Sequence, residues 1–239
     1  MSEPASARHG VVAVGVWLMS GYGLSLGGVT AQSWAVWLAW ALADCCTLHA
    51  VNGAAAGEVV RDQLPLLRGR YRLACGGTGA NDLIGFTEKA FTASVAELLR
   101  GLRRHADVVV FTTLPLLHPR TTELSARKAL SRLSTMNRLI RVEAHTAGAV
   151  LVDLERALRA PFRMGPDRQH PTSLGQLEVA RSAAVALDAA GVRFARHLPD
   201  PTVVVVPPSE QAMYNGPAER RQSGWSAVTS WRSGRVQNR

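Results

Sequence analysis

The residues in this chain whose types and spacing could do chemistry begin with Asp167 and His170. They lie three positions apart in a polar loop, directly before Pro171. A carboxylate at this spacing can hold one imidazole nitrogen, which leaves the other nitrogen to act as a general base. So short a motif also recurs by chance, and a polar loop followed by a histidine near a helix start has the same pattern. The motif therefore has to be judged together with the elements that position it.

The motif lies between two segments with a clear hydrophobic pattern. Residues 149–153 before it form a strand-like apolar run, and an apolar-periodic segment after it extends to Gly191. Pro171 suits the first turn of a helix, where the N–H that proline lacks would have no intrahelical partner. His170 is therefore expected just outside a helix N-terminus.

The rest of the chain alternates strand and helix patterns. The strand candidates are continuous apolar runs, which is typical of strands buried on both faces. They cover residues 10–16, 45–51, 71–75, 108–112 and 149–153. The helical patterns lie at residues 32–43 and 58–64, from Thr87 onward, at 121–147 and at 171–191. This alternation predicts an α/β fold with a five-stranded parallel sheet, covered on both faces by the helices of right-handed βαβ units.

The patterning also divides the chain into three parts. Residues 1–9 form a polar lead, residues 10–199 one domain, and residues 200–239 an appended basic tail. An apolar content of 47% with 19% charged residues is typical of a globular protein. The tail is expected to be mostly disordered, with room for one edge strand at residues 202–206.

The net charge of +9 raises the question of a nucleic-acid partner. Of the 27 basic residues only Lys89 and Lys128 are lysines, and no basic run is interleaved with aromatic residues. This points to a compositional bias towards arginine and not to a phosphate-binding surface, so we expect no nucleic-acid partner. The basic residues of segment 121–147 are typical of a solvated helix face, with an acidic partner or a lipid headgroup as the alternative.

Neither a metal, a cofactor nor a membrane segment is expected. The cysteines Cys45, Cys46 and Cys75 form no C-x-x-C pair, and no histidine cluster accompanies them, so they are expected to be buried free thiols. The uncharged stretch 10–43 is interrupted by small and polar residues and does not supply the about 20 apolar residues of a spanning helix. We therefore expect a cytoplasmic protein, with secretion through the apolar N-terminus as the alternative. Nothing in the sequence indicates an oligomeric state.

Polar or glycine-rich segments follow four of the five predicted strands. In open α/β sheets, ligands bind outside the carboxyl ends of the strands, so these segments are expected to converge on one rim. In chain order they are Val16 with Trp17, residues 53–57, residues 79–82, and Asp167 with His170.

In their order and placement these segments resemble the SGNH/GDSL hydrolase family, across roughly residues 10 to 195. That family has a Gly after the second strand, a Gly-x-Asn-Asp after the third and an Asp-x-x-His before the last helix. Gly57, residues 79–82 and the pair Asp167 and His170 match these blocks. The resemblance implies a three-layer α/β/α, flavodoxin-like fold. It also implies hydrolysis of carboxylic esters or other acyl groups of a small-molecule substrate, through a covalent acyl-enzyme.

The resemblance implies roles for four residues as well. The backbone N–H of Gly57 and the side chain of Asn81 would be the oxyanion donors, His170 the base and Asp167 the residue that orients it. Each preorganised donor to a tetrahedral intermediate can be worth about 3–4 kcal/mol. The alternatives are a turn glycine and an Asx-turn asparagine without a catalytic role.

The nucleophile block departs from the family pattern. The family has Gly-Asp-Ser after the first strand, and an ungapped alignment places Val16 at the Asp and Trp17 at the nucleophilic Ser. An indole cannot attack a carbonyl carbon. Three interpretations remain: a non-catalytic relative that binds a ligand or partner in the old cleft, a substitute nucleophile at Ser20 or the more distant Ser25, or direct activation of water by His170. We expect an intact scaffold with impaired or absent hydrolase activity.

Overall fold

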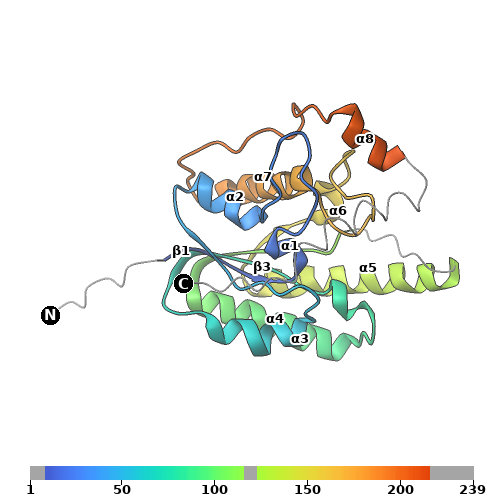
Figure 1. The fold of residues 1–239 in the computed structure, drawn as a ribbon. Helices are drawn as coiled ribbons and strands as arrows, with labels where there is room; N and C mark the ends of the chain where they lie inside the picture. The colour runs from blue at the N-terminus through green and yellow to red at the C-terminus, as the bar shows by residue number, and fades with distance from the viewer. Residues whose placement is uncertain (1–8, 116–122, 216–239) are drawn as a thin grey trace.

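A computed structural model describes residues 9–115 and 123–215 and places its strands in one parallel sheet (Figure 1). Its strands are β1 (His9–Gly15), β2 (Cys46–Leu48), β3 (Tyr71–Gly77), β4 (Ala106–Thr112) and β5 (Val150–Val152). The strand order in this described part of the chain is β2-β1-β3-β4-β5. This is the doubly wound order of flavodoxin-like folds, so the predicted fold class is confirmed.

Helices cover both faces of the sheet, which gives the three predicted layers. Helices α2 and α7 pack together on one face, and α4 and α5 lie on the other (Figure 1). The α-helices are α1 (Trp17–Ser20), α2 (Trp34–Ala41), α3 (Ala56–Glu58), α4 (Glu88–His105), α5 (Glu123–Thr146), α6 (Leu154–Ala157), α7 (Ser173–Ala189) and α8 (Pro208–Asn215). Three short helices of other types are η1 (Val59–Gln63), η2 (Leu64–Leu66) and η3 (Ala80–Leu83).

The two central strands explain why the apolar runs predicted the sheet so well. Strand β1 lies between β2 and β3, and its residues 11–14 are almost completely buried. A strand that is covered on both faces needs apolar side chains at successive positions, and this requirement produces a continuous run in the sequence. The pairing of β1 with β3 ends at Gly15 and Gly77, which places both strand ends at the same rim.

The helix after the Asp167–His170 loop begins later than predicted. Thr172 is its N-cap, because the Thr172 side chain accepts a hydrogen bond of 3.1 Å from the backbone N–H of Gly175. Pro171 therefore precedes the helix instead of lying in its first turn. It forms an isolated antiparallel bridge with Met164, which closes the loop that carries Asp167 and His170.

The segment predicted as one helix at residues 58–64 is divided. A short α-helix passes into the π-helix η1 and then into the 3₁₀-helix η2, which contains Pro65. Proline lacks the N–H of a regular α-helical turn, so a continuous α-helix cannot run through this position. The wide turn of η1 ends at Gln63, which is almost completely buried.

Residues 200–215 extend the folded unit beyond the predicted boundary at residue 199. Val206 is buried against Leu26 and Leu174, in a small apolar cluster separate from the main core. The backbone N–H of Gly27 donates a 2.8 Å hydrogen bond to Glu210 in α8. Residues 202–206 do not form the expected edge strand. Val204 and Val206 pack against the cluster that contains Leu26 instead of pairing with the sheet, and Val203 and Val205 are exposed. The rest of the predicted tail, residues 216–239, lies outside the described residues, as does the polar lead up to residue 8.

Two further predictions from composition can be compared with the structure. Cys45, Cys46 and Cys75 are free thiols as predicted, but only Cys75 is buried, whereas Cys46 is partly buried and Cys45 is exposed. Burial raises the pKa of the Cys75 thiol. In the part of the chain that the structure describes, no helix is both long enough and apolar enough to cross a membrane.

We predict that residues 200–215 stabilise the domain. A chain that ends after residue 199 exposes Leu26 and Leu174 and removes the acceptor of the Gly27 N–H. Relative to a chain that ends after residue 215, we expect the free energy of unfolding to fall by about 2–4 kcal/mol. Urea denaturation followed by tryptophan fluorescence measures this difference. Equal midpoints for the two chains would show that the segment adds no stability.

Candidate active site

The structure brings Asp167 and His170 into direct contact. The Nδ1 atom of His170 lies 2.7 Å from Oδ2 of Asp167, and the two side chains are 23% and 15% exposed. The other carboxylate oxygen accepts the backbone N–H groups of Gln169 and His170, at 2.9 and 3.1 Å. A carboxylate with three donors on it has one orientation, and it fixes the imidazole ring in turn.

The electrostatics of this pair favour an ionised carboxylate. Burial by itself would raise the pKa of Asp167. The hydrogen bonds from the His170 ring and from the backbone N–H groups of Gln169 and His170 outweigh burial and lower this pKa below its ordinary value. An ionised Asp167 accepts a hydrogen bond from the Nδ1–H of His170, so Nε2 is the nitrogen left to accept a proton.

Among the described residues, the aromatic rings of Trp17 and Tyr22 face the imidazole. The ring centroid of Trp17 lies 5.0 Å from that of His170 at an interplanar angle of 80°, and the ring of Tyr22 lies 4.9 Å away at 74°. Both are edge-to-face contacts, the arrangement that aromatic rings prefer. The Trp17 side chain is buried at the start of α1. The indole of Trp17, the residue that the sequence alignment predicted at the nucleophile position, therefore lies beside the histidine.

The two serines considered as substitutes make their hydrogen bonds elsewhere. The Ser20 hydroxyl lies 2.8 Å from Oδ1 of Asn52 and 3.0 Å from the carbonyl oxygen of Trp17. Ser25 is exposed, and its hydroxyl accepts the backbone N–H of Ala31. The structure does not bring either hydroxyl into a hydrogen bond with His170.

The segments that follow β2 and β3 are joined to each other. The side-chain amide of Asn81 donates a 2.9 Å hydrogen bond to the carbonyl oxygen of Ala54. The Asp82 carboxylate accepts the backbone N–H of Ala56, at 3.0 and 3.1 Å. Burial raises the pKa of Asp82, and the N–H of Ala56 opposes this rise. Gly57 lies in α3 directly after Ala56, so the two predicted oxyanion donors belong to one hydrogen-bonded unit.

Sequence reasoning missed Gln63, which joins this unit to the end of β1. The Gln63 side chain accepts the backbone N–H of Gly15 at 2.7 Å and donates to the Gly15 carbonyl oxygen at 2.9 Å. Gly15 has a φ of +139°, and a Cβ added there would meet the carbonyl oxygen of Gly77 at 2.1 Å. The one signal in the sequence was a polar glutamine directly before the apolar Leu64, in a segment with a helical pattern.

Tyr22 was also missed, because it lies in a glycine-rich loop that has no periodic pattern. This loop packs directly on the segment that carries His170. A Cβ added at Gly23 would meet the carbonyl oxygen of Pro171 at 2.2 Å, and the backbone N–H of Ser173 donates to Leu24 at 2.8 Å. An aromatic residue shortly after the first strand was the only signal available.

The sequence of the chain matches the model of the GDSL-like Lipase/Acylhydrolase family over residues 18–177. The chain belongs to this family. The match begins one residue after Trp17, so it covers the segments that carry Gly57, Asn81 and His170 but not Trp17 itself.

Solved structures show the same fold for this family member at low sequence identity. A carbohydrate acetylesterase family member from Sinorhizobium meliloti is 18% identical, with a TM-score of 0.59 over 77% of this chain and 100% of that one. The aryl esterase of M. smegmatis is 13% identical, with a TM-score of 0.59 over 78% and 100% of the two chains. An acetylxylan esterase variant from Geobacillus stearothermophilus is 13% identical, with a TM-score of 0.58 over 79% and 97%. No match to a curated protein sequence was found.

We predict that the Asp167 charge stabilises the folded state of this family member in a pH-dependent way. Its pKa is lowered on folding, so its contribution is complete above the unfolded-state pKa of about 3.9 and is lost as the pH falls through the lower folded-state value. We expect Asp167→Asn to lower the free energy of unfolding by about 1–3 kcal/mol at neutral pH and by less at acidic pH. Urea unfolding across the acidic range measures both.

The matched control for this experiment is Asp188→Asn. Asp188 pairs with Arg193 at 3.0 Å on the surface, where its side chain is 59% exposed. An exposed pair of this kind is worth about 0–1 kcal/mol, so the control should change stability little. A loss in Asp167→Asn that is the same at every pH would contradict the role of the charge.

Proposed function

We propose that this GDSL-family chain has a scaffold for hydrolysing carboxylic esters or other acyl groups of small molecules, and that its activity is impaired or absent. The observation that carries the proposal is the arrangement around His170. Asp167 holds one side of the imidazole at 2.7 Å, and the indole of Trp17 faces the ring where the family places its nucleophile.

The supporting chemistry is that of acyl transfer through a serine. Such a reaction needs a hydroxyl that His170 can deprotonate as it attacks the carbonyl carbon, and donors for the oxygen on which negative charge then develops. We assign the donors to the Gly57 N–H and to the Asn81 amide, which has a second N–H besides the one bonded to Ala54. The base and the donors persist in this proposal, and only the attacking oxygen is missing.

Two other sources of an attacking oxygen, Ser20 and a water molecule, would give slower hydrolysis. Ser20 would have to leave Asn52, to which it is hydrogen-bonded at 2.8 Å, before it could attack in place of Trp17. Water activated directly by His170 lacks the covalent intermediate that divides the reaction into two easier steps. Either route leaves the activity far below that of an intact triad.

A second candidate function is a non-catalytic binding module that uses the old cleft. The observation that favours it is the pair of rings, Trp17 and Tyr22, that lie edge-on against His170. Aromatic side chains provide large contact areas at ligand sites and each has a polar group for orientation. In this case the cleft retains the recognition of an acylated small molecule without its turnover.

We predict that restoring the nucleophile block will restore hydrolysis. Removing a nucleophile typically costs about 10⁶ in turnover and leaves about 10³–10⁴ over water. The wild-type chain should therefore hydrolyse p-nitrophenyl acetate about 10⁶ times more slowly than an intact triad would, and it should resist a fluorophosphonate probe. The double variant Val16→Asp with Trp17→Ser should hydrolyse the ester faster and be labelled at position 17, and adding His170→Ala should abolish both.

The matched control is Val16→Asp with Trp17→Ala, which removes the indole without supplying a hydroxyl. It should stay inactive and unlabelled, although both double variants leave a cavity where the indole packed. Strong wild-type activity that Ser20→Ala abolishes would show that the nucleophile has moved. A folded Trp17→Ser double variant without activity would favour the binding module.

A further inference from the structure

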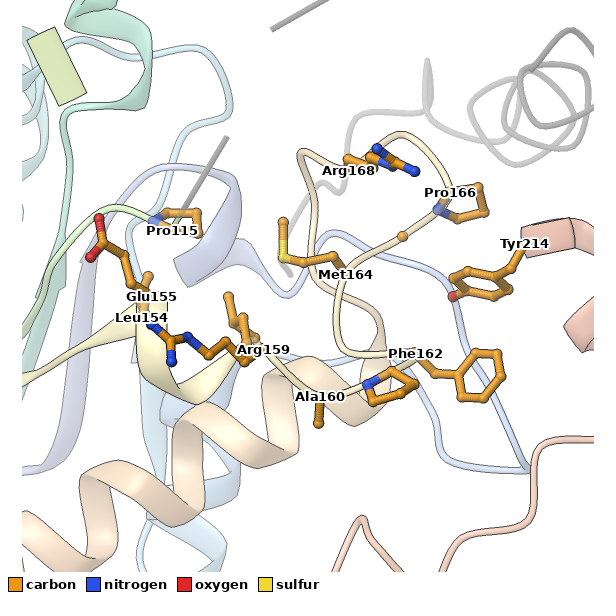
Figure 2. Close-up of a pocket in the computed structure, with 13 residues that line it drawn as sticks. Pro115, Leu154, Glu155, Arg159, Ala160, Phe162, Met164, Pro166, Arg168 and Tyr214 are labelled. Carbon is orange, nitrogen blue, oxygen red and sulfur yellow. The ribbon is translucent and has the colours of Figure 1, made fainter. Parts of the chain in front are cut away.

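A cavity of about 690 Å³ lies against the loop that carries Asp167, on the side of α6 and α8 (Figure 2). Its lining comes from three parts of the chain: Pro115 after β4, residues within 154–168, and Tyr214 of α8. His170, Trp17 and Asn81 are not among the residues that line it. The cavity is therefore distinct from the candidate active site, and a ligand could bind there whether or not the chain hydrolyses esters. Its volume is within the range of about 300–1,000 Å³ that is usual for small-molecule sites.

One part of the lining is apolar. Met164 and Phe162 line the cavity, and the Phe162 ring makes an edge-to-face contact with Tyr214 at 5.1 Å. Figure 2 shows Met164 between Arg159 and Arg168, with Phe162 and Tyr214 on the other side of the loop. A ligand in this cavity thus has an apolar surface to cover.

A second part of the lining is positively charged. Arg159 and Arg168 are exposed, and within residues 9–115 and 123–215 neither guanidinium group has an ion pair or a hydrogen bond. By contrast, the neighbouring Arg163 is paired with Glu178 at 3.3 Å. The one carboxylate in the lining, Glu155, already accepts the side-chain amide of Asn137 at 3.1 Å. The cavity thus presents two available cationic groups, which a carboxylate would match.

The Tyr214 hydroxyl is a third feature that a ligand could satisfy. Its oxygen is buried and has no hydrogen-bond partner in the described part of the chain. Burial, followed by the nearby charges of Asp167 and Glu210, raises the pKa of Tyr214, so the group stays a neutral donor. A buried donor without an acceptor costs about 1–3 kcal/mol, and the oxygen of a bound anion would relieve this cost.

We propose that this cavity binds a small organic anion, namely a carboxylate on an apolar body. The positive charges of Arg159 and Arg168 attract the carboxylate, and the apolar body lies against Met164. Binding there contacts Arg168, the residue next to Asp167, so the site borders the loop of the candidate base without including it.

The test is a titration of the full chain with octanoate, with 1-octanol as the uncharged comparison, by isothermal calorimetry. We expect saturable one-site binding of octanoate that weakens at high salt, and much weaker binding of 1-octanol. Arg159→Gln and Arg168→Asn should each weaken octanoate binding at least about fivefold, because each removes a positive charge from the cavity lining. Asparagine is chosen at position 168 because Arg168 has a φ of +55°, a conformation that Asn tolerates.

Three controls separate this site from its alternatives. Arg156→Gln removes an arginine of α6 that does not line the cavity and should leave the dissociation constant unchanged. Tyr214→Phe should weaken octanoate binding without lowering the midpoint of urea denaturation. His170→Ala should bind octanoate as the wild type does, whatever the outcome of the hydrolysis assays.

Several outcomes would overturn the proposal. Equal affinity for octanoate and 1-octanol would mean that the cavity is only an apolar pocket. Unchanged affinity in both Arg159→Gln and Arg168→Asn, with folding verified by circular dichroism, would remove the charged contacts from the site. Loss of binding in His170→Ala would place the ligand in the candidate active site, and no saturable binding by the wild type would exclude an organic anion.

Discussion

The rim of this domain depends on the double hydrogen bond between the Gln63 side chain and the backbone of Gly15. Gly15 ends β1 with a positive φ and lies so close to Gly77 that no side chain fits there. Gly15 is buried, and without Gln63 its N–H would lose the side-chain acceptor at a cost of about 1–3 kcal/mol. The carbonyl oxygen also accepts the N–H of Val51, so the same residue joins β1 to the segment after β2. The direction in which the chain leaves β1, and with it the place of Trp17, follows from this contact.

Trp17 changes the site in two ways that are coupled. In the proposed function it takes the place of the attacking oxygen, and it fills the space beside His170 with a side chain that is only 7% exposed and belongs to the main core. A serine at this position would leave a cavity where the indole packs, and such cavities destabilise in proportion to their volume. In the proposed function, the loss of a nucleophile would therefore also be a gain in packing. Asp167 and His170 hold each other through local contacts that do not involve residue 17, so their arrangement does not depend on a hydroxyl at that position.

Features that depend on local spacing could be predicted from the sequence, and features that depend on distant contacts could not. Continuous apolar runs predicted the strands, because a strand that is buried on both faces needs apolar residues at successive positions of its own sequence. The contact between Asp167 and His170 follows from a separation of three residues within one loop. In contrast, Gln63 has its role only because a π-helical turn brings it to Gly15, and Tyr22 only because its loop packs on Pro171. The burial of Val206 likewise requires Leu26 and Leu174. These residues are far from Val206 in the sequence, and no local pattern indicates that the three side chains pack together.

The C-terminal segment shows that the site of this family member extends beyond the strand-end segments that define its family. Glu210 holds Gly27, which belongs to the same glycine-rich loop as Tyr22, one of the two rings against His170. Four residues further along α8, Tyr214 borders the other loop, the one that carries Asp167, and the Asp167 charge contributes to the raised pKa of Tyr214. Helix α8 therefore contacts both loops between which the imidazole lies. A change in the packing of α8 would reach His170 through Tyr22 on one side and through Asp167 on the other, although no residue of α8 belongs to the catalytic blocks.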